Sequence, residues 1–310
     1  MQYDEATYDR IEGTLLGAAV GDALGAPYEF QIPGPAKPAM IGGGIGPWEP
    51  GEWTDDTQLT ICIARAAVEA ELEPIAVGER FKAWFTGARK DVGHQTGLVL
   101  AAADNADAMA EHAAELYAQR PRASAGNGSL MRTAPVALAH LGDDAALATT
   151  ARAVSDVTHG DPLCGDACVL WCIAIDRAIR EQRLDGIDDG IDLLPHRSRR
   201  TWIEWIDQAR REPLETFVPN GYVVTALQAA LAAITASEAA PTDPVRHGLT
   251  AAISIGHDTD TVGAIAGALL GARWGRSAIP PEWLSPLHGW PDLDADGLGV
   301  LARRVIASGD

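Results

Sequence analysis

Two segments of this chain carry a glycine at every fourth position, one near each end of the sequence. The first series is Gly13, Gly17, Gly21 and Gly25, and the second is Gly263, Gly267 and Gly271. Residues four apart lie on one face of an α-helix, where each glycine costs about 1 kcal/mol relative to alanine. A very close approach of two helix backbones would offset that cost. We therefore predict that the two segments pack together at the centre of the protein. The alternative is that each packs against an unrelated helix.

Two short clusters of carboxylates and hydroxyls also lie far apart in the sequence, each directly before an apolar run. They are Trp53-Thr54-Asp55-Asp56-Thr57 and His257-Asp258-Thr259-Asp260-Thr261. Taken singly, each is typical of a helix start, with Thr54 or Thr259 as the N-cap. If the glycine-rich helices bring the clusters together, their four aspartates would repel one another unless cations neutralise them. Oxygen-only ligands favour Mg²⁺ or Mn²⁺ over zinc, and this much charge favours two cations over one.

The rest of the pattern is helical nearly throughout, because alanine-rich periodic segments dominate and β-branched alternation is scarce. We predict helices over residues 4–24, 55–70, 74–86, 96–118, 127–139, 143–155, 162–182, 201–211, 222–235, 243–254, 259–274 and 293–307. The glycine- and proline-rich stretch 31–52 is a long loop of the kind kept for function, and 184–195 is expected to be a solvated surface connection. No linker divides the 310 residues, so the sequence predicts a single all-α domain over residues 1–310.

Composition excludes several classes of function. A formal net charge of -19 and a pI near 4.7 oppose a broad nucleic-acid surface or an anionic membrane as partner. The polar first ten residues are not typical of a secretion signal, and the apolar runs are too short to span a bilayer, so a cytoplasmic protein is expected. Cys164, Cys168 and Cys172 recur every four residues without a zinc or iron–sulfur spacing. We interpret them, with Cys62, as small buried hydrophobic residues.

Six motifs in order resemble the ADP-ribosylglycohydrolase family over about residues 11 to 275. They are the segment 13–29, Trp53-Thr54-Asp55-Asp56-Thr57, Gly126-Asn127-Gly128-Ser129-Leu130-Met131-Arg132, Thr158-His159-Gly160-Asp161, Gly221-Tyr222 and the segment 256–263. The resemblance implies a compact, orthogonal multi-helix bundle. It further implies a hydrolase that removes ADP-ribose from modified protein side chains, with a centre of two divalent cations, Mg²⁺ or Mn²⁺.

The same resemblance implies roles for particular residues. The implied metal ligands are Thr54, Asp55, Asp56, Asp258, Asp260 and Thr261. The implied substrate-binding residues are Gly126, Asn127, Gly128, Ser129, His159 and Tyr222. The glycine-rich turn would hold a diphosphate with backbone N–H groups, and Asn127 would begin a helix whose N-terminus favours that anion. His159 would lie along the nucleotide cleft, and Tyr222 would stack on the substrate or hydrogen-bond to it. Ser129-Leu130 departs from the pair of small residues found in many relatives.

Glu29 and Asp91 are the expected catalytic residues. Glu29 matches a mobile acidic residue of the family. Asp91 begins Asp91-Val92-Gly93-His94-Gln95-Thr96, which resembles the Asp-x-Gly-x-x-Thr motif of arginine-directed bacterial members. A carboxylate there suits a guanidinium leaving group, although Asp91 could instead be an N-cap for a helix at Thr96. We expect hydrolysis of arginine-linked ADP-ribose. The alternatives are hydrolysis of O-linked ADP-ribose or a free ADP-ribose derivative, and an immunity protein that counters an ADP-ribosyltransferase toxin.

Overall fold

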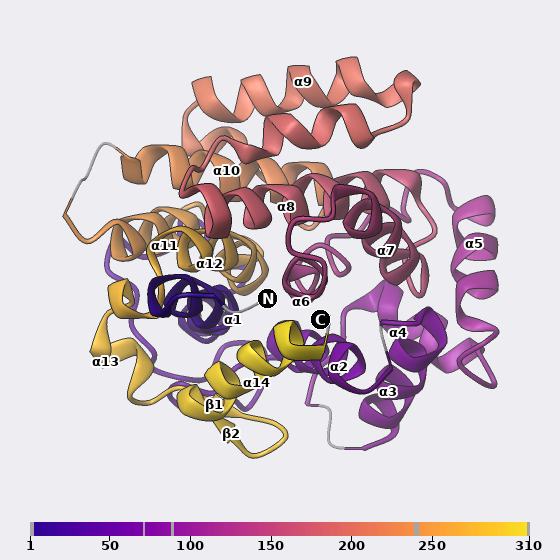
Figure 1. The fold of residues 1–310 in the computed structure, drawn as a ribbon, viewed down its shortest axis with the longest axis horizontal. Coiled ribbons are helices and arrows are strands. Elements are labelled where there is room, and N and C mark those ends of the chain that lie inside the picture. Colours follow the sequence, from indigo (N-terminus) through magenta and orange to yellow (C-terminus); the bar gives the residue numbers. More distant parts are fainter. Residues whose placement is uncertain (1–2, 71, 88–89, 239–241, 309–310) are drawn as a thin grey trace.

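The computed structural model describes residues 3–70, 72–87, 90–238 and 242–308, and helices make up nearly all the regular structure in them (Figure 1). The α-helices are α1 Glu5–Gly25, α2 Asp55–Ala70, α3 Pro74–Thr86, α4 His94–Ala102, α5 Met109–Gln119, α6 Ala134–Ala139, α7 Asp144–Asp156, α8 Pro162–Glu181, α9 His196–Arg211, α10 Val223–Glu238, α11 Pro244–Ser254, α12 Thr259–Trp274, α13 Pro281–Leu284 and α14 Ala295–Ser308. Short 3₁₀ turns are η1 Ala26–Tyr28, η2 Gly186–Leu193, η3 Leu214–Thr216 and η4 Arg276–Ala278. One antiparallel hairpin, β1 His288–Gly289 with β2 Leu293–Asp294, is the sheet structure of the described part. The predicted all-α class is confirmed.

The two glycine series face each other, which confirms the predicted pairing of α1 with α12. A Cβ atom on any glycine of either series would overlap backbone atoms of the opposite helix or of the turn that follows it. Both helices are buried along most of their length, and they lie side by side in Figure 1. Trp171 of α8 packs against this pair and donates a hydrogen bond from Nε1 to the carbonyl of Ile265 at 3.1 Å. The centre of the fold is therefore made from its two distant ends.

The C-terminal hairpin fixes the segment that leads into α2. Backbone hydrogen bonds join Trp53 N to His288 O at 3.1 Å and His288 N to Gly51 O at 3.0 Å. The fully buried Trp53 adds a bond from Nε1 to Trp290 O at 3.0 Å. This clamp sets where the first acidic cluster begins.

Three predicted helix boundaries were wrong. The stretch 96–118 is two helices, because Asn105 Oδ1 accepts a hydrogen bond from Ala108 N at 3.1 Å and stabilises a turn between α4 and α5. The stretch 127–133 forms turns, and α6 begins only at Ala134. Conversely, α9 begins five residues earlier than predicted, at His196. The predicted connection 184–195 contains the 3₁₀ turn η2.

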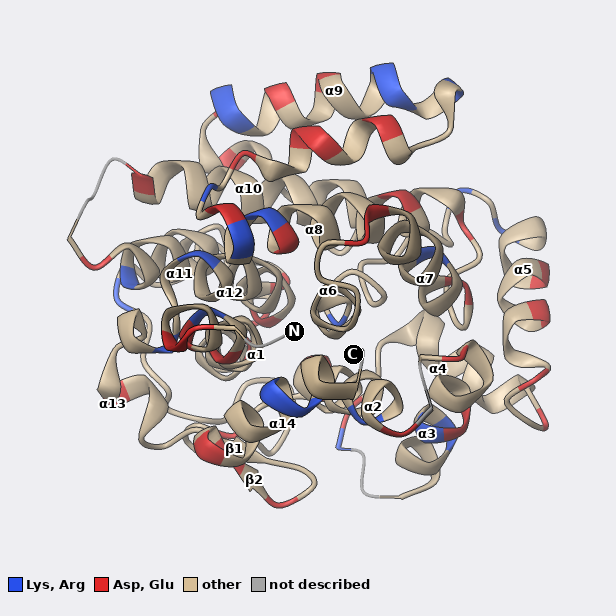
Figure 2. Ribbon diagram, viewed as in Figure 1, with Lys and Arg blue, Asp and Glu red and all other residues tan. Residues whose placement is uncertain are grey.

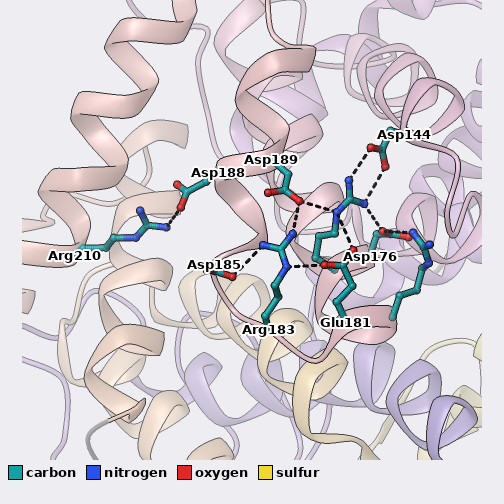
Figure 3. A network of polar contacts seen from close by, with 10 residues as sticks. Asp144, Asp176, Glu181, Arg183, Asp185, Asp188, Asp189 and Arg210 are labelled. Atoms are coloured by element: carbon teal, nitrogen blue, oxygen red, sulfur yellow. Dashed lines mark hydrogen bonds and ion pairs between the residues drawn. The ribbon is translucent and has the colours of Figure 1, made fainter.

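An ion-pair network fastens η2 to α8, and Figure 3 draws it from close by. Its hub is Arg177, which is largely buried and pairs with Asp144 at 2.6 Å, Asp176 at 2.5 Å and Asp189 at 2.9 Å. Elsewhere both signs of charge alternate on outer helices such as α9 (Figure 2). No helix in the described ranges is long and apolar enough to cross a membrane.

Candidate active site

One cavity of about 330 Å³ gathers the two acidic clusters. It is lined by Glu29, Phe30, Asp55, Asp56, Asp91, Gly93, His94, Gln95, Thr96, Ala123, Gly126, Asn127, Gly128, Met131, His159, Gly221, Asp258, Asp260 and Thr261. The helix pair α1 and α12 explains this convergence, since α12 begins within the second cluster and the chain that leaves α1 carries Glu29. Most of the predicted site residues therefore meet, whereas Thr54, Ser129 and Tyr222 do not line the cavity.

The carboxylates of this cavity are crowded. Oxygen atoms of Glu29, Asp258 and Asp260 all lie within 4.8 Å of one another. Burial, followed by the charge of Asp258, raises the pKa of Glu29 to about 8. Burial, followed by the charge of Asp91, raises the pKa of Asp55 to about 7. Burial also raises the pKa of Asp56 and of Asp260 well above the ordinary value, with the charges of neighbouring carboxylates second.

A further aspartate, Asp22, lies beneath the first cluster and was not predicted from the sequence. Asp22 of α1 is fully buried and accepts hydrogen bonds from Thr54 N at 3.1 Å, Thr57 N at 3.0 Å and Thr57 Oγ1 at 2.6 Å. Burial raises its pKa to about 6, with these bonds opposing the shift. The available signal was a carboxylate beside Gly21 in the otherwise uncharged stretch 13–25 of this helix. Asp22 thus couples the glycine-rich helix to the start of α2.

Thr54 supports the site from behind the cavity wall. It is buried, its Oγ1 lies 3.3 Å from Asp56 Oδ2, and it accepts a weak N-cap bond from Asp56 N at 3.4 Å. Thr259 is not a side-chain cap, because its hydroxyl donates to Gly25 O at 2.8 Å. The prediction that a threonine side chain caps the following helix is therefore confirmed in part for Thr54 and is wrong for Thr259.

The loop carrying Glu29 is clipped to the loop carrying Asp258. Phe30 N donates to His257 O at 2.6 Å, and His257 N donates to Gln31 O at 3.1 Å. Phe30 and His257 both adopt the left-handed backbone region, with φ of 60° and 62°, which is costly for large side chains. The two hydrogen bonds between these strained loops hold Glu29 against the second acidic cluster.

The glycine-rich turn is anchored by Asn127. Asn127 Nδ2 donates to Asp258 Oδ2 at 2.7 Å and to Asn220 O at 3.1 Å. Asn220 Oδ1 in turn accepts from Asp258 N at 2.9 Å, so Asn220 is a further residue that sequence reasoning missed. Asn127 N donates to Gly221 O at 3.2 Å and does not begin an α-helix, which corrects the predicted anion-binding helix start.

The remaining predicted binding residues fall in different places. Ser129 is buried behind the turn, where its Oγ accepts from Ser155 Oγ at 2.9 Å. Tyr222 is 41% exposed and pairs through its backbone with Gly126, outside the cavity. His159 lines the cavity but is nearly fully buried, and burial lowers its pKa well below the ordinary value, with Arg132 second.

Asp91 faces the same cavity from the loop before α4. It is not a helix N-cap, because α4 begins at His94 with Gly93 as its cap residue. Its Oδ1 accepts from Val92 N at 2.7 Å, and Gly93 N donates to Asp55 Oδ2 at 3.2 Å. Lys90 is held by Glu52 at 2.6 Å. The Asp91 loop is thereby tied to the first acidic cluster and to the segment before it.

The donor set of the cavity fits hard divalent cations. Every carboxylate is an oxygen ligand, and Asp56 Oδ1 is buried without a hydrogen-bond partner in the described structure. A buried acceptor without a partner, beside several carboxyl groups whose pKa values are raised, needs a compensating positive charge. Asp55, Asp56, Asp258, Asp260 and Thr261 could hold such cations from the cavity wall, with Thr54 behind Asp56.

Fold and cavity together define an all-α protein whose acidic pocket joins two distant acidic clusters to loops from the middle of the chain. The ADP-ribosylglycohydrolase family model matches residues 4–309. The chain belongs to the ADP-ribosylglycohydrolase family and is a hydrolase.

Individual relatives align over nearly the whole chain. It is 31% identical to the ADP-ribosyl-[dinitrogen reductase] glycohydrolase of Rhodospirillum rubrum, with 91% of each protein covered. It is 30% identical to the ADP-ribosylarginine hydrolase Tri1 of Pseudomonas putida (strain GB-1), covering 90% of this chain and 74% of that protein. A solved structure described as an ADP-ribosylglycohydrolase-related protein complex superposes with a TM-score of 0.77 at 31% identity. That alignment covers 99% of this chain and 100% of the other.

Proposed function

We propose that this hydrolase removes ADP-ribose from N-linked arginine on modified proteins, with the help of two divalent cations, Mg²⁺ or Mn²⁺. The observation that carries the proposal is the cavity shared by the four carboxylates of the acidic clusters with those of Glu29 and Asp91. One of the bacterial relatives named above supports the arginine linkage, because it is an ADP-ribosylarginine hydrolase by name.

Residues on both walls of the cavity would hold the cations. Asp55 and Asp56 come from the start of α2, whereas Asp258, Asp260 and Thr261 come from the start of α12. Thr54 remains a proposed ligand, although its hydroxyl lies behind Asp56. Bound divalent cations would neutralise this charge and polarise ribose hydroxyl oxygens and water.

The protein's own groups would handle protons at the scissile bond. Hydrolysis breaks the bond between ribose C1″ and the guanidino nitrogen. Water supplies the new hydroxyl, and the departing nitrogen takes up a proton. Charge develops on the ribose as in other glycoside cleavages, so nearby carboxylates stabilise it. Asp91 would accept hydrogen bonds from the guanidinium fork and orient it. Glu29, half-buried beside Asp258 and Asp260, would hold or move a proton on the attacking side.

The substrate's diphosphate would lie over the turn formed by Gly126 and Gly128. The absence of side chains there leaves room between the turn and His159, since a Cβ on Gly128 would approach His159 Cε1 to 3.1 Å. We also propose a cytoplasmic location, supported by four cysteines that are free and buried, because intracellular thiols stay reduced.

The cation centre is tested with arginine-modified protein as substrate. We expect the Asp258→Ala, Asp260→Ala double variant to lose Mg²⁺- or Mn²⁺-dependent release of ADP-ribose while remaining folded by circular dichroism. Wild-type turnover in that variant would refute the centre. The Asp207→Ala change, at an exposed position of α9 outside this cavity, is the control.

The linkage is tested separately with a panel of substrates. We expect release from arginine-linked substrate to exceed release from serine-linked protein and from O-acyl ADP-ribose derivatives. Activity confined to an O-linked substrate would replace the arginine assignment with the second candidate. Protection against an ADP-ribosyltransferase that survives loss of both aspartates would favour an immunity protein instead.

A further inference from the structure

A buried arginine behind the cavity has no acidic partner in the described residues. Arg132 is 0% exposed, and its Nε and Nη1 atoms have no hydrogen-bond acceptor there. Its guanidinium lies over the ring of Phe81, 4.4 Å from the centroid. A buried cation without a carboxylate is costly, so the one hydrogen bond that it makes needs an explanation.

That bond goes to Thr158. Arg132 Nη2 donates to Thr158 Oγ1 at 2.6 Å, and Thr158 Oγ1 lies 2.7 Å from His159 Nδ1. Gln95 Nε2 donates to Thr158 O at 3.2 Å, and His159 N donates to Ser155 O at 2.9 Å, so the backbone on both sides is fixed. The three side chains form a row from the core to the cavity wall.

The donors and acceptors available in this row determine where its protons lie. Arg132 can only donate, so Thr158 Oγ1 must accept from it. The Thr158 hydroxyl proton has no acceptor other than His159 Nδ1 in the described structure, since the atoms near Oγ1 that bond to it are those of these two neighbours. If Nδ1 carried a proton instead, the buried hydroxyl proton would be left unsatisfied, which costs free energy. The imidazole proton therefore belongs on Nε2.

We propose that Arg132 and Thr158 are positioning residues that hold His159 as the Nε2–H tautomer, so that it donates a hydrogen bond to an anionic oxygen above the Gly126 and Gly128 turn. A Cβ on Gly128 would lie 3.2 Å from Nε2 and one on Gly126 would lie 3.5 Å from it, so this atom faces the turn. The choice of a diphosphate oxygen as acceptor rests on the proposed function. The tautomer itself does not.

The electrostatic setting favours a neutral donor over an imidazolium. His159 is 1% exposed and lies near the Arg132 cation. Both factors oppose a second proton on the ring. His159 is thus suited to bind through one fixed N–H over the whole neutral pH range.

The test is ¹⁵N NMR of the histidine side chains together with calorimetry, using ADP-ribose as the probe. In the ligand-free wild type, we expect the His159 Nδ1 resonance of an unprotonated nitrogen and the Nε2 resonance of a protonated one. A Thr158→Val variant keeps the shape and removes the hydroxyl. We expect the Nδ1 and Nε2 resonances of this variant to move toward each other and its Kd for ADP-ribose to rise about tenfold. Its kcat should stay within about threefold of the wild-type value. Thr158→Ser, which retains the hydroxyl, should restore both values.

Two results would overturn the inference. One is a protonated Nδ1 in the wild type, and the other is a Thr158→Val variant with unchanged resonances and unchanged Kd. If Thr158→Val does not fold, the wild-type spectrum and the Thr158→Ser variant still decide. A wild type that shows the Nε2–H signature but does not bind ADP-ribose would support the tautomer and overturn the proposed function.

Discussion

Gly25 of α1 lies directly against Asp260 of α12: a Cβ atom on Gly25 would be 2.6 Å from the Cα of Asp260. The last residue of one glycine-rich helix therefore sets the position of a carboxylate in the cavity. Backbone atoms on both sides leave no flexible side chain to move aside.

Gly25→Ala is accordingly expected to destabilise the protein by about 3 kcal/mol or more, because the added methyl group overpacks a rigid backbone contact. Urea denaturation measures the change. Gly97→Ala in α4 is the matched control, since the nearest atom to its Cβ is Val92 Cγ1 at 3.4 Å. The control should be neutral or stabilising by about 1 kcal/mol. Equal stabilities of the two variants would contradict the close-packing argument.

Without divalent cations, the thermal stability of the protein should fall as pH rises. Glu29, Asp55 and Asp22 have pKa values raised to about 8, 7 and 6. A carboxyl group whose pKa is higher in the folded state than in the unfolded state stabilises the fold while it is protonated. This stabilisation is complete below the pKa of the unfolded state and is lost as pH rises through the pKa of the folded state. These three groups act between about pH 4 and pH 8. The lowered pKa of His159 opposes them by adding stability as pH rises to about 6.5, so the fall is expected between about pH 6.5 and pH 8. Thermal unfolding in EDTA measures the trend, and added Mg²⁺ or Mn²⁺ should reverse it near pH 8.

The control for this pH profile is Asp260→Asn, which removes one charge from the cluster and should flatten the slope in EDTA. The lowered pKa values of Asp144 and Asp189 act only below about pH 4, outside that pH range. A Tm that rises between about pH 6.5 and pH 8 in EDTA would show that these carboxylates are not mutually repelling.

Asp22→Asn should weaken the site without touching the cavity. The amide offers one acceptor where the carboxylate satisfies Thr54 N, Thr57 N and Thr57 Oγ1, so the loss is about 3 kcal/mol. We expect a lower unfolding midpoint and a smaller Tm increase on adding Mn²⁺. Asp9→Asn, on the same helix, is the control, because Asp9 also accepts from a backbone N–H but in an exposed bond. It should cost less than about 1 kcal/mol.

Lys90→Met should lower turnover more than stability. Lys90 Nζ lies 2.6 Å from Glu52 Oε1 and adjoins Asp91 in sequence. Without this ion pair the Asp91 carboxylate is held less precisely beside the leaving group. We therefore expect kcat to fall about tenfold. The partly exposed pair itself is worth less than about 1 kcal/mol. Arg200→Met, which breaks the exposed Arg200–Glu204 pair on α9, should leave kcat unchanged.

Features marked by a repeating sequence pattern were predicted correctly. The glycine series predicted the contact of α1 with α12, and the two acidic clusters predicted four of the carboxylates in the cavity wall. The turn between α4 and α5 escaped detection because alanines run through it, although Asn105 was an available turn signal. Asp22 was hidden by its place in a glycine-rich helix. The Arg132, Thr158 and His159 row was out of reach, because it joins residues 26 positions apart through a contact that no local pattern records.

The pairing of α1 with α12 also governs when the protein can become active. Its partners are separated by nearly the full length of the chain, so a polypeptide emerging from the ribosome carries Asp55 and Asp56 long before Asp258 and Asp260 exist. The first acidic cluster therefore has no partner until the second has been synthesised, and contacts between residues so far apart in sequence are slow to form. Enzymatic competence is thus withheld from every product of an interrupted synthesis that ends before Asp258 and Asp260.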